Sequence, residues 1–169
     1  PGFEADDFMA SAAKREVESG GACLILTTDR DAYQLVSESV TVLCPRRGSP
    51  VPARIDPLEV VRELGVLPEQ VPCYKALCGD PSDKIPGARG IGPKTAARLL
   101  LRHGALEEAV ASWPDVEAER ALMFRRVALM RYDAPAELPI EGPDWLAGSR
   151  ALRELGAVSL ADRMGSLAS

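Results

Sequence analysis

The sequence predicts an α/β domain with a mainly parallel sheet, followed by a helical region. Helical and strand-like patterns alternate over residues 4–43, as they do where helices connect parallel strands. Residues 57–131 then carry only helical patterns. The 169 residues, 46% hydrophobic and 27% charged, suffice for one core, and no apolar run approaches the ~20 residues of a membrane span.

The first part of the chain supplies the sheet. Apolar residues at helical spacing predict an amphipathic helix over residues 4–18, which a pair of glycines ends. The apolar run at 22–27 predicts a buried strand. A short helix over 32–36 and a second strand over 40–43 are expected next. Residues 45–54, rich in Pro, Gly and Arg, predict a loop or hairpin.

The second part of the chain is predicted to be helical. Asp56 is a good N-cap, Pro57 suits the first helical position, and Gly65 ends this helix. Four more short helices, separated by Pro or Gly, are predicted over 68–78, 93–103, 105–112 and 117–131. The weakly patterned tail predicts a strand at Leu138–Ile140 and helices near 149–155 and 159–164.

The four cysteines indicate a reducing compartment. None of them forms a C-x-x-C pair, and their density is low for an extracellular disulfide scaffold. Cys23 and Cys44 lie in apolar runs, where a cysteine serves as a small core residue. We therefore expect reduced cysteines in a cytoplasmic protein.

Acidic residues gather in three clusters. They are Glu4-Ala5-Asp6-Asp7, Asp29-Arg30-Asp31 and Asp80-Pro81-Ser82-Asp83. Carboxylates this dense repel one another unless cations hold them, and Mg²⁺ and Mn²⁺ prefer oxygen ligands. The second cluster follows the carboxyl end of a predicted strand, where the sites of α/β domains lie. Each cluster alone favours ordinary capping or turn chemistry, whereas the three together favour a metal site.

A glycine-rich turn precedes the predicted helix over 93–103. Glycines at 87, 90 and 92 permit a tight turn that presents backbone N–H groups to phosphate. The basic residues along one flank of the helix are Lys94, Arg98 and Arg102. Because Pro93 stands where a P-loop requires lysine, nucleotide binding is disfavoured. The two remaining interpretations are a contact to the DNA backbone and a helix–turn–helix corner without ligand.

The charge of the chain is unevenly distributed. A formal net charge of −5 ordinarily disfavours nucleic acid as a partner. Residues 1–39, however, hold eight acids and three bases, whereas residues 84–106 hold five Lys and Arg residues and no acid. Setting aside the seven clustered carboxylates leaves +2, and two bound divalent ions would bring the total to −1. We therefore expect DNA binding to be poor without metal.

The motifs resemble those of the bacterial 5′-nuclease, or flap endonuclease-like, family, which occurs at the N-terminus of DNA polymerase I and as stand-alone proteins. The matching segments, in the order and spacing of the family, are Gly2–Asp7, Thr28–Leu35, Gly79–Gly87 and Gly90–Ala96. The resemblance implies a PIN-like partial parallel sheet followed by a helix-hairpin-helix (H3TH) subdomain. It further implies a nuclease-core portion over 1–54, the H3TH subdomain over 55–132, and a tail over 133–169 that packs on the core.

The resemblance also implies an activity, a metal-dependent 5′-3′ exonuclease and 5′-flap endonuclease of DNA replication and repair with two Mg²⁺ or Mn²⁺. One metal would be held by Glu4, Asp6 and Asp7. The second would be surrounded by catalytic residues Asp29, Asp31, Asp80 and Asp83. The DNA backbone would be bound by Gly87, Gly90, Ile91, Gly92, Lys94, Thr95 and Arg98. In relatives, a K⁺ ion on the carbonyls of the turn assists this binding. The resemblance also implies a monomeric protein associated with the bacterial nucleoid. In some relatives the nuclease domain is fused to a DNA polymerase.

Two departures from the family limit the expected activity. Lys84 stands where the family has an amide residue. The first strand of the family, a second metal-binding aspartate and the basic helical arch all precede the Gly2–Asp7 motif, and the start at Pro1 looks like a cut inside a longer protein. We therefore expect little or no nuclease activity from these 169 residues alone.

Two alternatives to the nuclease stay open at this point. One is a non-catalytic module that binds DNA through the hairpin without reading its sequence. The other is a D-x-D phosphatase with Asp29 as the nucleophile, which is disfavoured because such an enzyme has no use for the basic hairpin.

Overall fold

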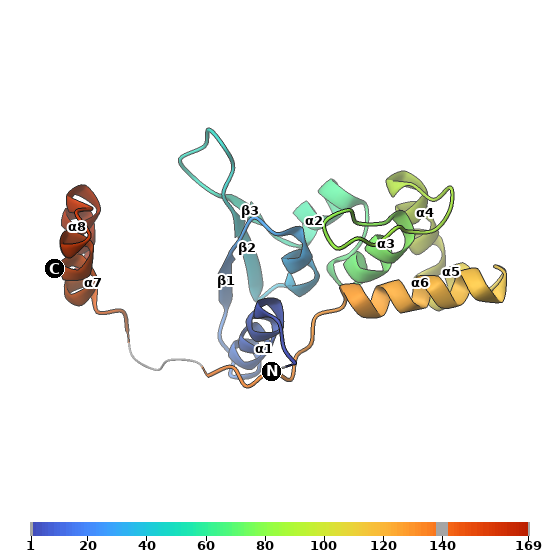
Figure 1. Ribbon diagram of the computed structural model, residues 1–169, viewed down its shortest axis with the longest axis horizontal. Helices are drawn as coiled ribbons and strands as arrows, with labels where there is room; N and C mark the ends of the chain where they lie inside the picture. Colours follow the sequence, from blue (N-terminus) through green and yellow to red (C-terminus); the bar gives the residue numbers. More distant parts are fainter. Residues whose placement is uncertain (1, 138–141, 169) are drawn as a thin grey trace. The chain divides into compact units, whose positions relative to one another are not determined.

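A computed structural model describes residues 2–137 and 142–168 of the chain (Figure 1). The chain divides into two compact units, Pro1–Ala136 and Glu137–Ser169, which are described separately. The strand predicted at Leu138–Ile140 lies outside the described residues.

The first unit contains a three-stranded sheet. Its strands are β1 (Cys23–Leu26), β2 (Val40–Cys44) and β3 (Ala53–Ile55), in the order β1-β2-β3. β1 and β2 are parallel, with Ile25 opposite Val42, so the predicted α/β pairing is confirmed. β3 returns antiparallel to β2 and forms the second strand of a hairpin within residues expected to be a loop or hairpin. Helix α1 (Ala5–Glu18) precedes β1, and the 3₁₀ helix η1 (Arg30–Leu35) connects β1 to β2.

The prediction that β1 is a buried strand is wrong. Ile25 is buried, but Leu24 and Leu26 are 60% and 68% exposed. Side chains alternate between the two faces of a strand, so only the Ile25 face packs on the core. Among the described residues β1 pairs with β2 alone, and the opposite face is left open. An apolar run therefore does not show that both faces of a strand are covered.

The helices of the first unit follow the local signals in the sequence. They are α2 (Pro57–Leu64), η2 (Pro68–Gln70), α3 (Val71–Cys78), α4 (Pro93–His103), α5 (Leu106–Val110) and α6 (Asp115–Ala128). The Asp56 carboxylate caps α2 by accepting from the Glu59 N–H at 2.8 Å. The region predicted as one helix over 68–78 divides into η2 and α3, since Pro72 has no N–H to continue a helix through this point.

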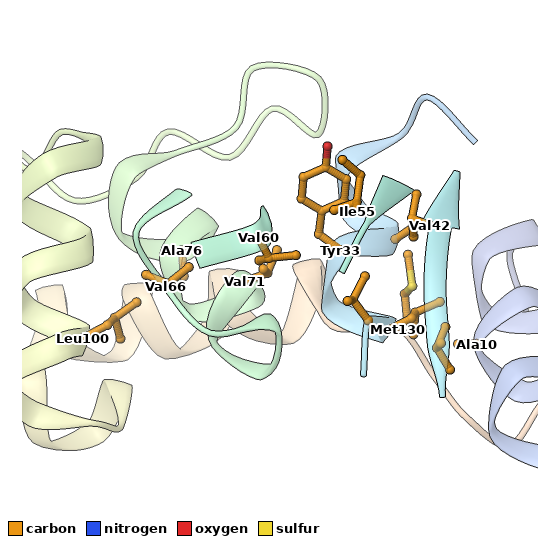
Figure 2. Packing of buried hydrophobic residues seen from close by; sticks show 14 of the residues in the cluster. Ala10, Tyr33, Val42, Ile55, Val60, Val66, Val71, Ala76, Leu100 and Met130 are labelled. Atoms are coloured by element: carbon orange, nitrogen blue, oxygen red, sulfur yellow. The ribbon is translucent and has the colours of Figure 1, made fainter. Parts of the chain in front are cut away.

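One hydrophobic core joins the sheet to the helices of the first unit (Figure 2). Tyr33 of η1 and Val42 of β2 lie in the same cluster as Val60 of α2, Val71 of α3 and Leu100 of α4. The sheet residues and the helical hairpin therefore belong to one packed body, which places the acidic loops at a defined distance from the basic turn.

After α6 the chain returns along α1 as an extended strap, Leu129–Ala136. The Arg131 N–H donates to Asp7 Oδ1 at 2.8 Å, and the Ala134 N–H donates to Ser11 Oγ at 2.9 Å. α6 thus ends at Ala128, three residues before the predicted end, because the strap hydrogen bonds to α1 instead of continuing the helix.

The second unit is a pair of helices, α7 (Trp145–Glu154) and α8 (Val158–Gly165), followed by η3 (Ser166–Ala168). Asp144 caps α7, which therefore begins four residues before the predicted 149. The packing of residues 133–169 on the core stays a prediction. No helix in the described ranges is long and apolar enough to cross a membrane, since the longest, α1 and α6, have 14 residues.

Candidate metal centre and nucleic-acid interface

The acidic clusters converge in the structure. One cavity of about 290 Å³ is lined by Glu4, Asp6, Asp7, Asp29, Asp31 and Asp83, with Val127–Met130 as its remaining wall. These are six of the seven acids predicted as metal ligands. They come from the start of α1, from the loop after β1 and from the loop after α3, so the fold brings together segments far apart in the sequence.

The acids at the start of α1 have different surroundings. Burial and the neighbouring carboxylates of Asp29, Glu4, Asp7 and Asp83 raise the pKa of Asp6, as expected where negative charges crowd. Asp7 is buried, and both of its oxygens accept backbone N–H groups, from Glu4 at 3.0 Å and from Arg131 at 2.8 Å. Asp7 therefore fixes the strap to α1, besides facing the cavity.

Asp29 and Asp31 lie at the carboxyl end of β1. Asp29 is the N-cap of η1, where its Oδ1 accepts the Asp31 N–H at 2.9 Å. Asp31 lies in the first turn of η1, which begins at Arg30 and so two residues before the predicted helix over 32–36. The cap keeps the two carboxylates in a fixed relation.

A tight loop after α3 holds the third acidic cluster. Asp80 and Ile85 exchange two backbone hydrogen bonds of 2.8 Å, which close the loop. The Asp80 Oδ1 also accepts the Ser82 N–H at 2.8 Å. Lys84 has a left-handed φ of 56°. Asn adopts this conformation more readily than other residues with side chains, so an asparagine at position 84 would be less strained than the lysine.

Lys75 of α3 lies among three of the carboxylates and was not predicted from the sequence. Its ammonium contacts Asp31 Oδ1, lies 2.6 Å from Asp80 Oδ2 and lies 3.4 Å from Asp83 Oδ2. The side chain is only 8% exposed. Although burial acts in the opposite direction, hydrogen bonds from Lys75 and Ser82 lower the pKa of Asp80 to about 2. The available signal was that Lys75 is the one charged residue of the apolar α3.

The chemistry of this cluster fits a divalent cation. One carboxylate oxygen from each of Asp31, Asp80 and Asp83 lies within 4.8 Å of the other two. All the donors are oxygens, which are the ligands that Mg²⁺ and Mn²⁺ prefer. In this structure the cation that lies among these carboxylate oxygens is the Lys75 ammonium. The seventh predicted ligand, Asp80, is thus connected to Asp31 and Asp83 through Lys75.

The turn before α4 is closely packed against α3. The Ala88 N–H donates to the Leu77 carbonyl at 2.8 Å, and the Ile91 N–H donates to the Ala88 carbonyl at 3.1 Å. Gly87 has a φ of +72°, and a Cβ there would lie 2.5 Å from the Gly79 nitrogen. Glycine is therefore required at position 87 by both conformation and space.

The predicted DNA-binding residues share this turn and the first two turns of α4. Gly90, Gly92, Lys94 and Arg98 are exposed, and Gly87, Ile91 and Thr95 are half-buried. Gly92 is the N-cap of α4, and no side chain caps the helix start. The first N–H groups and two cations are thus presented on one exposed surface, which suits a phosphate group.

A cleft of about 570 Å³ connects the acids with the start of α4. It is lined by Thr28–Asp31, by Lys75 and its neighbours on α3, by Gly79–Ser82 and by Pro93. A nucleic-acid backbone bound at the turn would therefore have a path to the carboxylates.

Family models match the chain over nearly its whole length. Residues 1–65 match the 5′-3′ exonuclease N-terminal resolvase-like domain. Residues 66–146 match the 5′-3′ exonuclease C-terminal SAM fold. The chain is also 48% identical to DNA polymerase I of Mycobacterium leprae over 84% of its own length, and 40% identical to the thermostable DNA polymerase I of Thermus thermophilus over 82%. It spans 16% and 17% of those proteins.

Solved structures share the fold. The T5 D15 protein co-crystallized with metal ions has a TM-score of 0.61 and 22% identity, covering 78% of this chain and 51% of that one. The T5 5′-exonuclease with bound zinc has a TM-score of 0.60 and 21% identity, covering 75% and 47%.

Proposed function

The chain belongs to the 5′-3′ exonuclease family, and on this premise we propose that it carries most of the metal-binding and duplex-binding groups of a nuclease acting at DNA 5′ ends and 5′ flaps. The reaction would be metal-dependent hydrolysis of a phosphodiester bond. The observation that carries this proposal is the convergence of three separate acidic segments on one cavity, joined by a cleft to a basic turn.

The residues have two roles in this proposal. The group Glu4, Asp6 and Asp7 would hold one divalent ion, and the group Asp29, Asp31, Asp80 and Asp83 would hold the second. Two bound divalent ions supply an activated water and stabilise the charge that develops on the attacked phosphate. The hydrogen bond from the Asp31 N–H to the Asp29 carboxylate and the closed Asp80–Ile85 loop keep the carboxylates in place. The positioning of these ligands therefore comes from the folded chain.

The basic turn would hold the duplex by its backbone. Lys94 and Arg98, together with the uncapped start of α4, offer contacts to phosphate that carry no sequence information. We propose that a K⁺ ion on the turn carbonyls assists this contact. We further propose that the protein is monomeric and cytoplasmic, acts in replication and repair, and is fused to a polymerase.

The test is hydrolysis of a 5′-flap DNA with Mg²⁺ or Mn²⁺. It is measured for the 169-residue chain and for a restored protein, in which the first strand, the second aspartate and the basic helical arch of the family are supplied before Pro1. We expect the restored protein to cleave and the chain alone to cleave little. Cleavage by neither would contradict the proposal.

A pair of cap substitutions makes this test specific. Asp29→Asn and Asp56→Asn both replace an N-capping aspartate by the comparable cap asparagine. Only Asp29 faces the acidic cavity. We expect Asp29→Asn to abolish flap cleavage by the restored protein and Asp56→Asn to leave it unchanged. Flap binding without cleavage by the restored protein would instead support the non-catalytic DNA-binding module.

A further inference from the structure

We propose that Lys75 is a resident counter-cation that competes with a divalent ion for the carboxylates of Asp31, Asp80 and Asp83. The inference rests on the metal site of the proposed function and adds a residue that controls its occupancy. The metal-free cluster is then held together by Lys75, and an entering ion must displace the ammonium before all three carboxylates can coordinate it.

The position of the ammonium carries the proposal. Three atoms that all lie within 4.8 Å of one another have a common centre at most about 2.8 Å from each, which is the length of an ammonium–carboxylate hydrogen bond. The Lys75 Nζ occupies this region, with Asp80 Oδ2 at 2.6 Å and Asp83 Oδ2 at 3.4 Å. Magnesium–oxygen distances are about 2.1 Å, so an ion bound to all three groups would need the same space.

Burial and charge make the competition strong. Lys75 is the one buried lysine of the described residues, whereas Lys14, Lys84 and Lys94 are exposed. An ammonium this buried is stable only while the carboxylates neutralise it. Removing the ammonium leaves three facing carboxylates without their cation, which destabilises the metal-free state and raises their attraction for a divalent ion.

The cleft beside Lys75 can receive the displaced side chain. Lys75 lines the cleft that runs from the carboxylates to Pro93 at the start of α4. A flexible lysine side chain can move its ammonium from the cluster into this cleft, where water solvates it. Metal binding would therefore make the Lys75 amine more accessible to solvent.

The experiment measures Mn²⁺ binding by the 169-residue chain, without DNA, by calorimetry and by the paramagnetic resonance of free Mn²⁺. The variants are Lys75→Met, Lys75→Arg and, as a matched control, Lys84→Met, which removes the same charge beside Asp83. We expect Lys75→Met to bind Mn²⁺ at least about ten-fold more tightly than the wild type, with a larger metal-induced rise in Tm. Lys75→Arg should bind as the wild type does, and Lys84→Met within about two-fold of it.

A second measurement uses the wild-type chain alone, so it does not depend on the folding of Lys75→Met. Acetic anhydride labelling of each lysine is read by mass spectrometry with and without Mn²⁺. We expect several-fold more labelling of Lys75 with the metal and unchanged labelling of Lys14. Equal Mn²⁺ affinities of the wild type and a folded Lys75→Met, or unchanged Lys75 labelling with Mn²⁺ bound, would overturn the inference alone. Absence of Mn²⁺ binding in the folded wild type and in Lys75→Met would overturn the proposed metal site, and the inference with it.

Discussion

Gln34 joins the Asp29–Asp31 segment to the end of α6, and its substitution by leucine is expected to lower the stability of the protein. The side chain is 7% exposed. Its Nε2 donates to the Asp31 carbonyl at 3.0 Å and to the Ala128 carbonyl at 3.1 Å, and its Oε1 accepts the Met130 N–H at 3.0 Å. Leucine has a similar size but would remove all three of these hydrogen bonds. At about 1–1.5 kcal/mol for each bond, we expect Gln34→Leu to lower the free energy of unfolding by roughly 3–5 kcal/mol.

The assay is urea unfolding of the chain followed by circular dichroism, with Gln70→Leu as the matched control. Gln70 also accepts a backbone N–H, from Leu67 at 3.1 Å, and donates to the Gly104 carbonyl at 2.8 Å and to the Leu100 carbonyl at 3.4 Å, but the two shorter bonds are exposed. Water can replace them, so we expect Gln70→Leu to cost only about 1 kcal/mol. If Gln34→Leu cost no more than Gln70→Leu, the argument from burial would be refuted.

Three further predictions concern the loop glycines, Lys84 and Tyr33. Gly87→Ala should lower the free energy of unfolding by more than ~2 kcal/mol in urea unfolding, whereas Gly90→Ala, with φ +77° but open space around it, should cost only about 1 kcal/mol; equal costs would contradict the steric argument. Lys84→Asn should raise the free energy of unfolding by about 0.5–1 kcal/mol because asparagine tolerates the left-handed φ, and a loss of stability would count against this. Burial, with the charge of Glu63, raises the pKa of Tyr33 to about 12, above its unfolded value of ~10. The neutral phenol therefore contributes to the free energy of unfolding in full below pH 10, and this contribution is lost as the pH rises to 12. Alkaline titration of unfolding free energies should show a smaller loss over this interval in Tyr33→Phe, and identical losses would exclude Tyr33 as the cause.

Elements with local signals could be predicted from the sequence. α4 runs over the predicted 93–103, since Pro93 suits the first helical turn and Gly104 follows the end. Asp56 and Gly65 bound α2 in the same way. The strand β3 lacked such a signal, because three residues are held in extended form by pairing with β2 rather than by their own propensity.

The acids of the site could be named from the sequence, but their geometry could not. The convergence of Glu4, Asp29 and Asp83 on one cavity depends on how α1, η1 and the loop after α3 pack. Lys75 was missed for the same reason, since its partners Asp31 and Asp83 lie 44 and 8 residues away. Local pattern indicates which residue types are available, and tertiary packing decides which of them meet.

The strap has a consequence for the order of events during synthesis. Its hydrogen bonds to α1 join residues 123 and 124 positions apart, and Val127–Met130 form one wall of the acidic cavity. At ~5–20 residues per second, a ribosome needs roughly 6–25 s to go from Asp7 to Arg131. Contacts between such distant residues also form late in folding because a long loop must close first. The acids of α1 are therefore made early, whereas the residues that form this wall of the cavity are among the last of the first unit to be made.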